Sequence, residues 1–443
     1  MNHRRYYIAA TLALLFLNRA ALAQNTTTGE QQLSLTDVWE KAVANNKQLH
    51  IKQLQVQTAQ EEVKDAKAER LPEINVGAEY ARVSNMPVFE NGLFGTPSQF
   101  PVLHSTYGGD ADAYLNIYNG GRTNLNIAQK KTLANVQQIR MAQTTSQVKL
   151  QAAMLYLQLQ KSIVFRQLLL SDIAFQEKQL QKIEQLRKNG VVLKSDVLRA
   201  QLQLSKQKLS LNTIDNDIAI ANQQLDVTMG EPDDIRIKPD TAVAVDTAGL
   251  KSYNDYLSDA YQHAFAGKIS EGETQLRELQ LKSAKGKNMP KVGLFANYKL
   301  SYPQIMFYPY SPYFYGLGLA GVRATFSISG LYINRHKIKV AELELKTQET
   351  EHSDVQDNIR LSVNNAYLRL QEARHKVEVA RTNVKQAREN SRIVNNTYFN
   401  QTSLITDLLD ANNALLQTRF ELAAAQIAVQ AQYFQLQNAI GNL

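Results

Sequence analysis

One long pattern occurs twice in this chain, at a constant offset of 211 positions. Matching pairs include Tyr156 and Tyr367, Asp196 and Asp407, and Gly230 and Gly441. Each copy holds a run without glycine or proline, at 122–188 and at 331–400. As one helix, the first run would reach about 100 Å. A duplicated pair of such helices excludes an ordinary globular arrangement and indicates a coiled-coil or repeat architecture.

After each long run, a second helix is predicted to return along the first. Apolar residues recur every seven positions in both return segments. They are Val197, Leu204, Leu211, Ile218 and Leu225 in the first copy and Leu408, Leu415, Leu422, Val429 and Leu436 in the second. A sustained heptad indicates left-handed supercoiling against a partner helix.

The two helices of each copy are joined by a short turn, at 189–194 and 400–405. Asn-Gly at the first turn can end a helix through a left-handed residue. Ser195 and Thr406 suit the N-cap of the return helix, and Asp196 and Asp407 are favoured in its first turn by the helix dipole. Each segment could be a plain surface turn, but its duplication at the far end of very long helices indicates a functional role.

Before its long helix, each copy is predicted to have a shorter helix and then a β-hairpin. In the first copy the helix covers 35–71 and the hairpin 73–118. In the second copy the helix covers 252–287 and the hairpin 291–326. Apolar and polar residues alternate in the strands. The apolar set holds Ile74, Val76, Leu115, Ile117, Leu294 and Ala296, and the polar set holds Asn75, Glu79, Asp112, Asn116, Asn297 and Lys299. Residues 85–105 are expected to be a loop.

The chain therefore divides into a signal peptide at 1–23, a first repeat at 24–230, a linker at 231–251 and a second repeat at 252–443. Residues 1–23 have a basic start, a short apolar run and an Ala21-Leu22-Ala23 cleavage site. The sequence has no cysteine, so neither a disulfide nor a lipid on an N-terminal cysteine is expected. Removing three arginines with the signal lowers the net charge from +8 to +5, and this mild, interspersed charge argues against nucleic-acid binding.

No motif predicts catalysis, a cofactor or a metal site. Gly316 to Gly321 match the dinucleotide fingerprint, but they lie inside a predicted strand rather than before a helix. Small residues on one face of a barrel strand explain them better. The histidines are scattered without the spacing of metal ligands. We therefore expect a protein that is not an enzyme.

The hairpins predict a membrane-spanning assembly of several chains. Strands of about ten to fourteen residues suit a tilted transmembrane strand. A bilayer tolerates no open sheet edge, so four strands cannot span it alone, whereas three chains would supply about 12 strands. Tyrosines around the second hairpin indicate an aromatic girdle in contact with membrane lipid; they are Tyr298, Tyr302, Tyr308, Tyr310, Tyr313 and Tyr315. The predicted fold is mainly α with a transmembrane β-barrel: a trimer forming a 12-stranded β-barrel on an α-helical barrel.

The chain resembles the TolC family of outer-membrane efflux channels along essentially its whole mature length. The resemblance rests on the duplicated order of elements, on the Tyr118-Asn119-Gly120-Gly121-Arg122 turn and on the two helix turns. It implies a homotrimer in the outer membrane with a periplasmic helical tunnel. It also implies docking to a periplasmic adaptor (membrane fusion) protein and an inner-membrane pump. The expected function is a passive exit duct for efflux or type I secretion, with drugs, metal cations or proteins all open as cargo. The alternative is a structural or adhesive coiled-coil protein of the envelope.

The resemblance also implies a constriction and a docking end. Asp407 and Asp410 share one helix face and match the family's acidic rings, so a trimer would present six carboxylates. Asp407 has a counterpart in Asp196 and could simply serve the helix dipole, whereas Arg199 stands where a counterpart of Asp410 would be. Tyr398 matches the latch of the closed aperture, but Ser403 replaces the family's basic latch residue. The adaptor-docking tip is expected at Asn189, Gly190, Val191, Leu193, Ser195, Asn400, Gln401, Leu404 and Thr406.

Overall fold

A computed structural model describes residues 30–100, 102–233, 235–240, 250–303 and 311–443. The predicted signal peptide at 1–23, together with Tyr308 and Tyr310, lies outside the described residues. The chain separates into two compact units. The first comprises 1–50, 144–260 and 361–443, and the second comprises 51–143 and 261–360.

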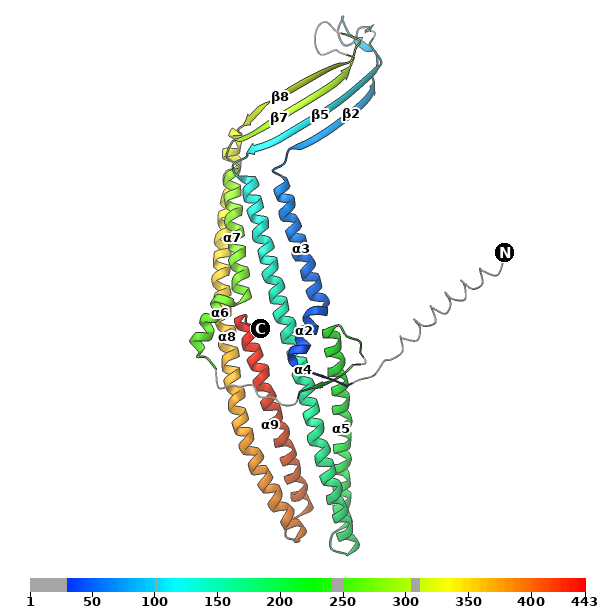
Figure 1. The fold of residues 1–443 in the computed structure, drawn as a ribbon, viewed down its shortest axis with the longest axis vertical. Coiled ribbons are helices and arrows are strands. Elements are labelled where there is room, and N and C mark those ends of the chain that lie inside the picture. The colour runs from blue at the N-terminus through cyan, green and yellow to red at the C-terminus, as the bar shows by residue number, and fades with distance from the viewer. Residues whose placement is uncertain (1–29, 101, 234, 241–249, 304–310) are drawn as a thin grey trace, which may run out of the picture. The chain divides into compact units, whose positions relative to one another are not determined.

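Helices make up most of both units. In chain order they are α2 (Leu35–Asn45), α3 (Lys47–Ala68), α4 (Arg122–Lys188), α5 (Lys194–Met229), α6 (Tyr253–His263), α7 (Phe265–Gly286), α8 (Ile328–Phe399) and α9 (Ile405–Ile440) (Figure 1). The two long helices, α4 and α8, are confirmed, and each contributes residues to both units. No helix within the described ranges carries an apolar stretch long enough to cross a bilayer.

Two of the predicted helices are interrupted. The helix expected over 35–71 breaks at Asn46, whose extended backbone (φ −68°, ψ 124°) separates α2 from α3. The Asn46 side chain accepts a hydrogen bond from the Gln48 amide at 2.9 Å. The helix expected over 252–287 breaks in the same way at Ala264 (φ −59°, ψ 126°). Neither break falls at a glycine or proline, so the sequence lacked the residues that usually indicate the end of a helix.

The second unit contains one antiparallel sheet of four strands, in the order β2-β5-β7-β8 (Figure 1). The strands are β2 (Glu73–Arg82), β5 (Ser105–Tyr118), β7 (Lys291–Tyr302) and β8 (Tyr315–Thr325). The segment 85–105, expected to be a plain loop, contains a small hairpin of β3 (Met86–Val88) and β4 (Ser98–Phe100). Pro87 is tolerated because β3 has only one partner strand, and proline in sheets is confined to such edge strands.

The strand register separates the predicted apolar and polar sets. Directly opposed residues of neighbouring strands share a face. Asn75, Asp112 and Asn297 are aligned across three strands, and Asn297 donates a hydrogen bond to the Asp112 carboxylate at 2.5 Å. Ile74 and Ala296 align through Ala113 on the other face. The register shifts between Asn116 and Tyr118, so the ladder leaves Ile117 unpaired.

The alternation reverses on β8. Leu317 and Leu319 oppose Lys299 and Asn297 and therefore lie on the polar face. Gly321, opposite Phe295, lies there too. Thus the glycines of 316–321 do not all share one face, contrary to the prediction. Large rings explain the glycines: on the apolar face a Cβ at Gly318 would lie 3.2 Å from the Tyr298 ring, and on the polar face one at Gly321 would lie 3.3 Å from Phe295.

Aromatic rings form a ladder at the end of the apolar face distant from the helices. Tyr80, Tyr107 and Tyr302 oppose one another across β2, β5 and β7. Their ring centroids are 5.2 Å and 5.5 Å apart, and Phe314 lies 5.3 Å from Tyr302. Of this ladder, only Tyr302 belongs to the predicted tyrosine set.

The first unit is built around packed helices closed by a two-stranded parallel sheet. Strand β1 (Glu30–Leu33) pairs with β6 (Arg236–Pro239), so the predicted linker contains a strand. The Tyr156 hydroxyl joins them: it donates to the Leu33 carbonyl at 3.0 Å and accepts from the Asp240 amide at 2.9 Å. The heptad residues of α5 and α9 lie on the packed side; Leu225, Leu408 and Leu436 are fully buried.

Candidate functional site

The two turns that join the helix pairs have the same backbone geometry. Gly190 and Gln401, 211 positions apart, both adopt the left-handed conformation, with φ of +74° and +64°. In each turn the next amide reaches back five residues: Val191 donates to the Leu186 carbonyl and Thr402 to the Thr397 carbonyl, both at 2.9 Å. This is the Schellman ending of a helix. Gln401 adopts it without the freedom of glycine, at a cost of roughly 1–2 kcal/mol.

The N-caps of the return helices lie two residues before the expected positions. Leu193 and Leu404 occupy the N-cap positions, both with extended backbones. The prediction of Ser195 and Thr406 as caps is therefore wrong; both lie inside the first turn. At the start of α9, the Asp407 carboxylate caps the helix instead, because it accepts a hydrogen bond from the Leu404 amide at 3.1 Å.

A shared apolar cluster packs the two turns against each other. It contains Ile183, Val197 and Ala200 from α4 and α5, and Tyr398, Ile405 and Leu408 from α8 and α9. Tyr398 is 5% exposed, and its hydroxyl has no hydrogen-bond partner among the described residues. Burial, together with the negative charge of Asp196, raises the pKa of Tyr398 to about 12. In the single chain, this predicted latch residue is a core residue of the tips.

We expect Tyr398→Phe to keep or raise the thermal unfolding midpoint. A buried hydroxyl without a partner carries a desolvation cost of roughly 1–3 kcal/mol, which phenylalanine removes while preserving the packing. Tyr398→Ala is the matched control, and it should lower stability by about 3–5 kcal/mol through the cavity it leaves. Differential scanning fluorimetry in detergent measures both. If Tyr398→Phe unfolded several degrees earlier than the unchanged chain, the hydroxyl would have a partner in the assembled protein.

The two acidic candidates for the constriction are exposed on the first turns of α9. Asp407 and Asp410 lie three residues apart on one helix side, and Asp410 has no ion pair or hydrogen bond within the described chain. No lysine or arginine occurs between 393 and 418. The turn from α8 to α9 therefore carries two carboxylates without a basic residue from its own segment.

The docking candidates at the tips are largely exposed. Leu193 and Leu404 are 71% and 68% exposed, although each would normally be buried in a core. Asn189, Gly190, Val191, Ser195, Asn400 and Gln401 are also exposed, while Thr406 is half-buried. The structure thus presents one exposed leucine at each of the two turns.

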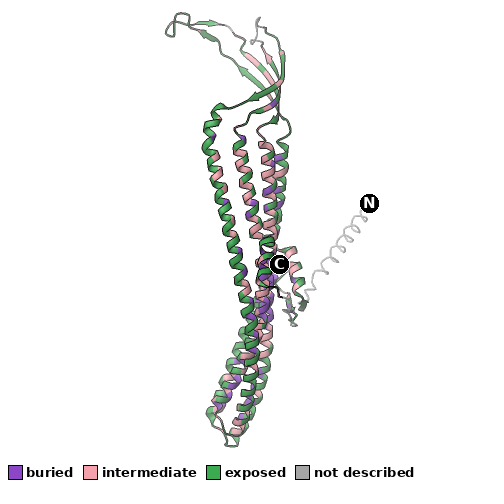
Figure 2. Cartoon of the chain, turned by 90° about the vertical axis from the view of Figure 1, so that its left-hand side faces the viewer, coloured by how far each residue is buried: buried purple, intermediate pink, exposed green. Residues whose placement is uncertain are grey.

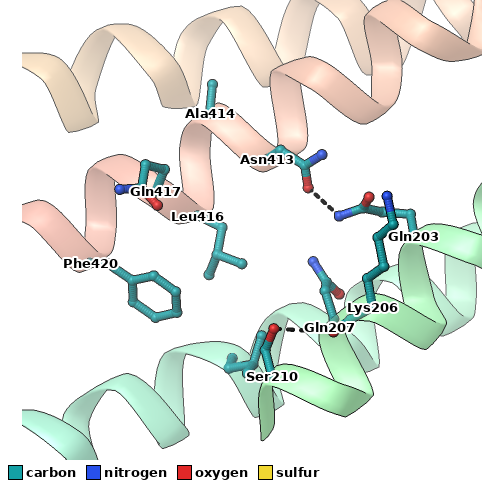
Figure 3. Close-up of a pocket in the computed structure, with 10 residues that line it drawn as sticks. Gln203, Lys206, Gln207, Ser210, Asn413, Ala414, Leu416, Gln417 and Phe420 are labelled. Atoms are coloured by element: carbon teal, nitrogen blue, oxygen red, sulfur yellow. Dashed lines mark hydrogen bonds between the residues drawn. The ribbon is translucent and has the colours of Figure 1, made fainter. Parts of the chain in front are cut away.

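A cavity with a mainly apolar lining lies between the return helices, beyond the tip cluster. It has a volume of about 430 Å³ and is bordered by side chains of α5 and α9 (Figure 3). Gln203 donates to the Asn413 side chain across it at 2.6 Å, and Phe420 and Leu416 supply an apolar side (Figure 3). Sequence patterns did not reveal this cavity, because its lining residues come from faces that meet only in the folded chain. Within the described ranges, no three histidine or acidic side chains gather as a metal site would require.

Comparisons with solved structures identify the same fold in known channels. The outer-membrane channel OprN is 16% identical, with a TM-score of 0.78, over 92% of this chain and 90% of that one. CusC is 15% identical, with a TM-score of 0.78, over 92% of each chain. VceC, an outer membrane protein from Vibrio cholerae, is 15% identical, with a TM-score of 0.75, over 92% of this chain and 96% of that one. A search of curated proteins found no match.

A family model gives the assignment. The model described as outer membrane efflux protein matches residues 38–231 and 273–442, which together exceed half of the chain and include both helix turns and both pairs of strands. The chain therefore belongs to the outer membrane efflux protein family.

Proposed function

We propose that this outer-membrane efflux channel works as a homotrimeric, passive exit duct. Cargo would enter at the helix tips from a periplasmic adaptor and an inner-membrane pump, and would leave through the membrane-embedded strands. The pump supplies the energy. The observation that carries the proposal is the combination, in one chain, of an open four-stranded sheet with two long helix pairs that present their turns together.

The sheet supports membrane insertion as a shared barrel. Both outer strands, β2 and β8, have one partner each in the described chain, so the sheet has two open edges. Open edges do not persist in lipid, because each unpaired backbone group costs several kcal/mol. Val76 and Ile74 are 81% and 67% exposed on the apolar face, which ends at the aromatic ladder. A lipid contact would cover that face and leave the polar face toward water.

Apolar stripes on two helices of the first unit support the trimer. On α5 the stripe consists of Leu202, Leu209, Ile220 and Val227, and on α8 it consists of Leu361, Leu368, Val379 and Ile393. At about 100° per residue, each set falls within an arc of about 40°. Every member is at least 46% exposed in the single chain. Figure 2 shows exposed residues interspersed with buried ones along the helices. Packing of α5 on α8 of a neighbouring copy would bury both stripes.

The face assignment predicts the accessibility of single cysteines in this cysteine-free chain. Cysteine at Asn75, Asp112 or Asn297 should react with a water-soluble thiol reagent in intact outer membranes. Cysteine at Ile74, Leu115 or Leu294 should be protected, because lipid would cover that face. Mass-shift labelling on gels gives the extent of reaction. Similar labelling of the two sets would refute the face assignment.

Reconstitution tests the duct itself. Purified full-length chain should have the mass of three copies in detergent and should give single-channel currents in planar bilayers. A structural or adhesive envelope protein would give no current. A monomeric or non-conducting protein, obtained with intact helicity by circular dichroism, would overturn the proposal.

A further inference from the structure

The two turns share a backbone geometry but differ in charge. Around the first turn, between 184 and 201, four basic residues stand against two acidic ones: Arg187, Lys188, Lys194 and Arg199 against Glu184 and Asp196. Around the second, between 395 and 412, Asp407 and Asp410 are the charged residues. Duplication has therefore produced one basic tip and one acidic tip.

The basic residues border a groove between the end of α4 and the start of α5. The groove has a volume of about 530 Å³ and is bordered by Arg187, Lys188 and Lys194, with Val197 and Leu198 on its apolar side. Its one acidic member, Glu184, already accepts a hydrogen bond from Gln201 at 3.3 Å. Leu193, which caps the start of α5 in the same turn, is 71% exposed.

The same helix pair neutralises its charges elsewhere. Further along α4 and α5, Lys208 pairs with Glu177 at 2.7 Å, and Arg166 pairs with Asp215 at 2.6 Å. In the described chain, Arg187, Lys188 and Lys194 form no such pair. Cations left unpaired around a groove attract a partner that carries the complementary charge.

We infer that the α4–α5 tip binds a surface of the adaptor that carries carboxylates and aliphatic side chains. The inference rests on the proposed function, which brings an adaptor to the tips, and it adds the chemistry of the contact. The exposed Leu193 and Leu198 supply the apolar contact, and the cations steer the partner's approach and fix its register. The acidic α8–α9 tip lacks this charge attraction, so its exposed Leu404 would supply an apolar contact only. The charge preference of the contact would thus come from the α4–α5 tip.

Two synthetic helical hairpins provide the probe. They differ only in the loop, which carries two leucines flanked by glutamates in one and by lysines in the other. Binding to the purified full-length channel is measured by fluorescence anisotropy at low and high salt. We expect the glutamate hairpin to bind at least tenfold more tightly than the lysine hairpin, with a preference that weakens as salt rises.

Charge reversal locates the binding. Lys188→Glu/Lys194→Glu should lower affinity for the glutamate hairpin at least tenfold. Lys385→Glu/Arg388→Glu is the matched control: it reverses two exposed cations of α8 that form no ion pair in the described chain, and it should bind as the unchanged protein does.

Each contrary result is distinct. Equal binding of the two hairpins, no binding of either, or equal loss in both variants would overturn the inference. Dissociation of the trimer by Lys188→Glu/Lys194→Glu, seen by light scattering, would also overturn it, because the basic tip would then be meeting a second copy of this chain. Conductance of the unchanged channel is recorded in parallel. Its absence would count against the duct, whereas normal conductance without the hairpin preference would leave the duct intact and remove only the acidic partner.

Discussion

Gly190→Glu/Leu404→Glu should abolish efflux while leaving trimer assembly and membrane insertion intact. Both residues are exposed at the turns, and a side chain at Gly190 would meet no atom within 4 Å, so the added bulk projects outward. The left-handed φ at Gly190 adds roughly 1–2 kcal/mol of strain, which a chain with such long packed helices should tolerate. At both tips, a charged chain would then stand where the adaptor must make close contact.

Drug or dye retention in cells that lack their own channel measures this loss, and outer-membrane fractionation measures insertion. Gly190→Ala/Leu404→Ala is the control, since it introduces the same backbone strain and removes the leucine without adding charge or much bulk. It should keep most of the efflux. Normal efflux by the glutamate variant would show that the adaptor does not contact these turns.

Asp407→Ala/Asp410→Ala should weaken both cation selectivity and block by multivalent cations. In a trimer, the exposed pairs would place six carboxylates around the axis, and acidic rings attract cations in channels. Crowding of like charges in this way is costly unless water or counterions fill the space. Stability should fall only by about 0.5–2 kcal/mol per chain, because the main lost contact is the hydrogen bond from the Leu404 amide.

Planar-bilayer recordings with a multivalent cation added on the periplasmic side measure the block, and reversal potentials measure the selectivity. Asp65→Ala/Asp217→Ala is a matched control that removes two exposed carboxylates from α3 and α5, outside both turn segments. It should leave block and selectivity unchanged. If the two variants behaved alike, Asp407 and Asp410 would be ordinary first-turn residues and the constriction would lie elsewhere.

The sequence alone determined the order of elements in each repeat, because the positions of glycine and proline limit how far a helix can extend. Glycine and proline are the usual interruptions of long helices, and their absence from 122–188 and 331–400 was enough to predict α4 and α8. The heptads placed the packed side of α5 and α9. Strand alternation separated Ile74 from Asn75, because side chains of successive residues point to opposite faces of a sheet. The left-handed backbone of Gln401, 211 positions after Gly190, emerged only from the structure, because glutamine rarely signals a left-handed turn.

Only the tertiary structure decided the features that depend on distant partners. The break at Asn46 and the strand β6 belong to the core of the first unit, where Val38 and Ile237 are buried, and no local signal marks them. The reversed faces of β8 follow from pairing with β7, whose Tyr298 and Phe295 rings need glycines beside them. Tyr398 was visible as a tip residue, but its burial against Ile183 and Val197 required the two helix pairs to meet. Local sequence specifies the elements, whereas burial and register are set by partners on other elements of the chain.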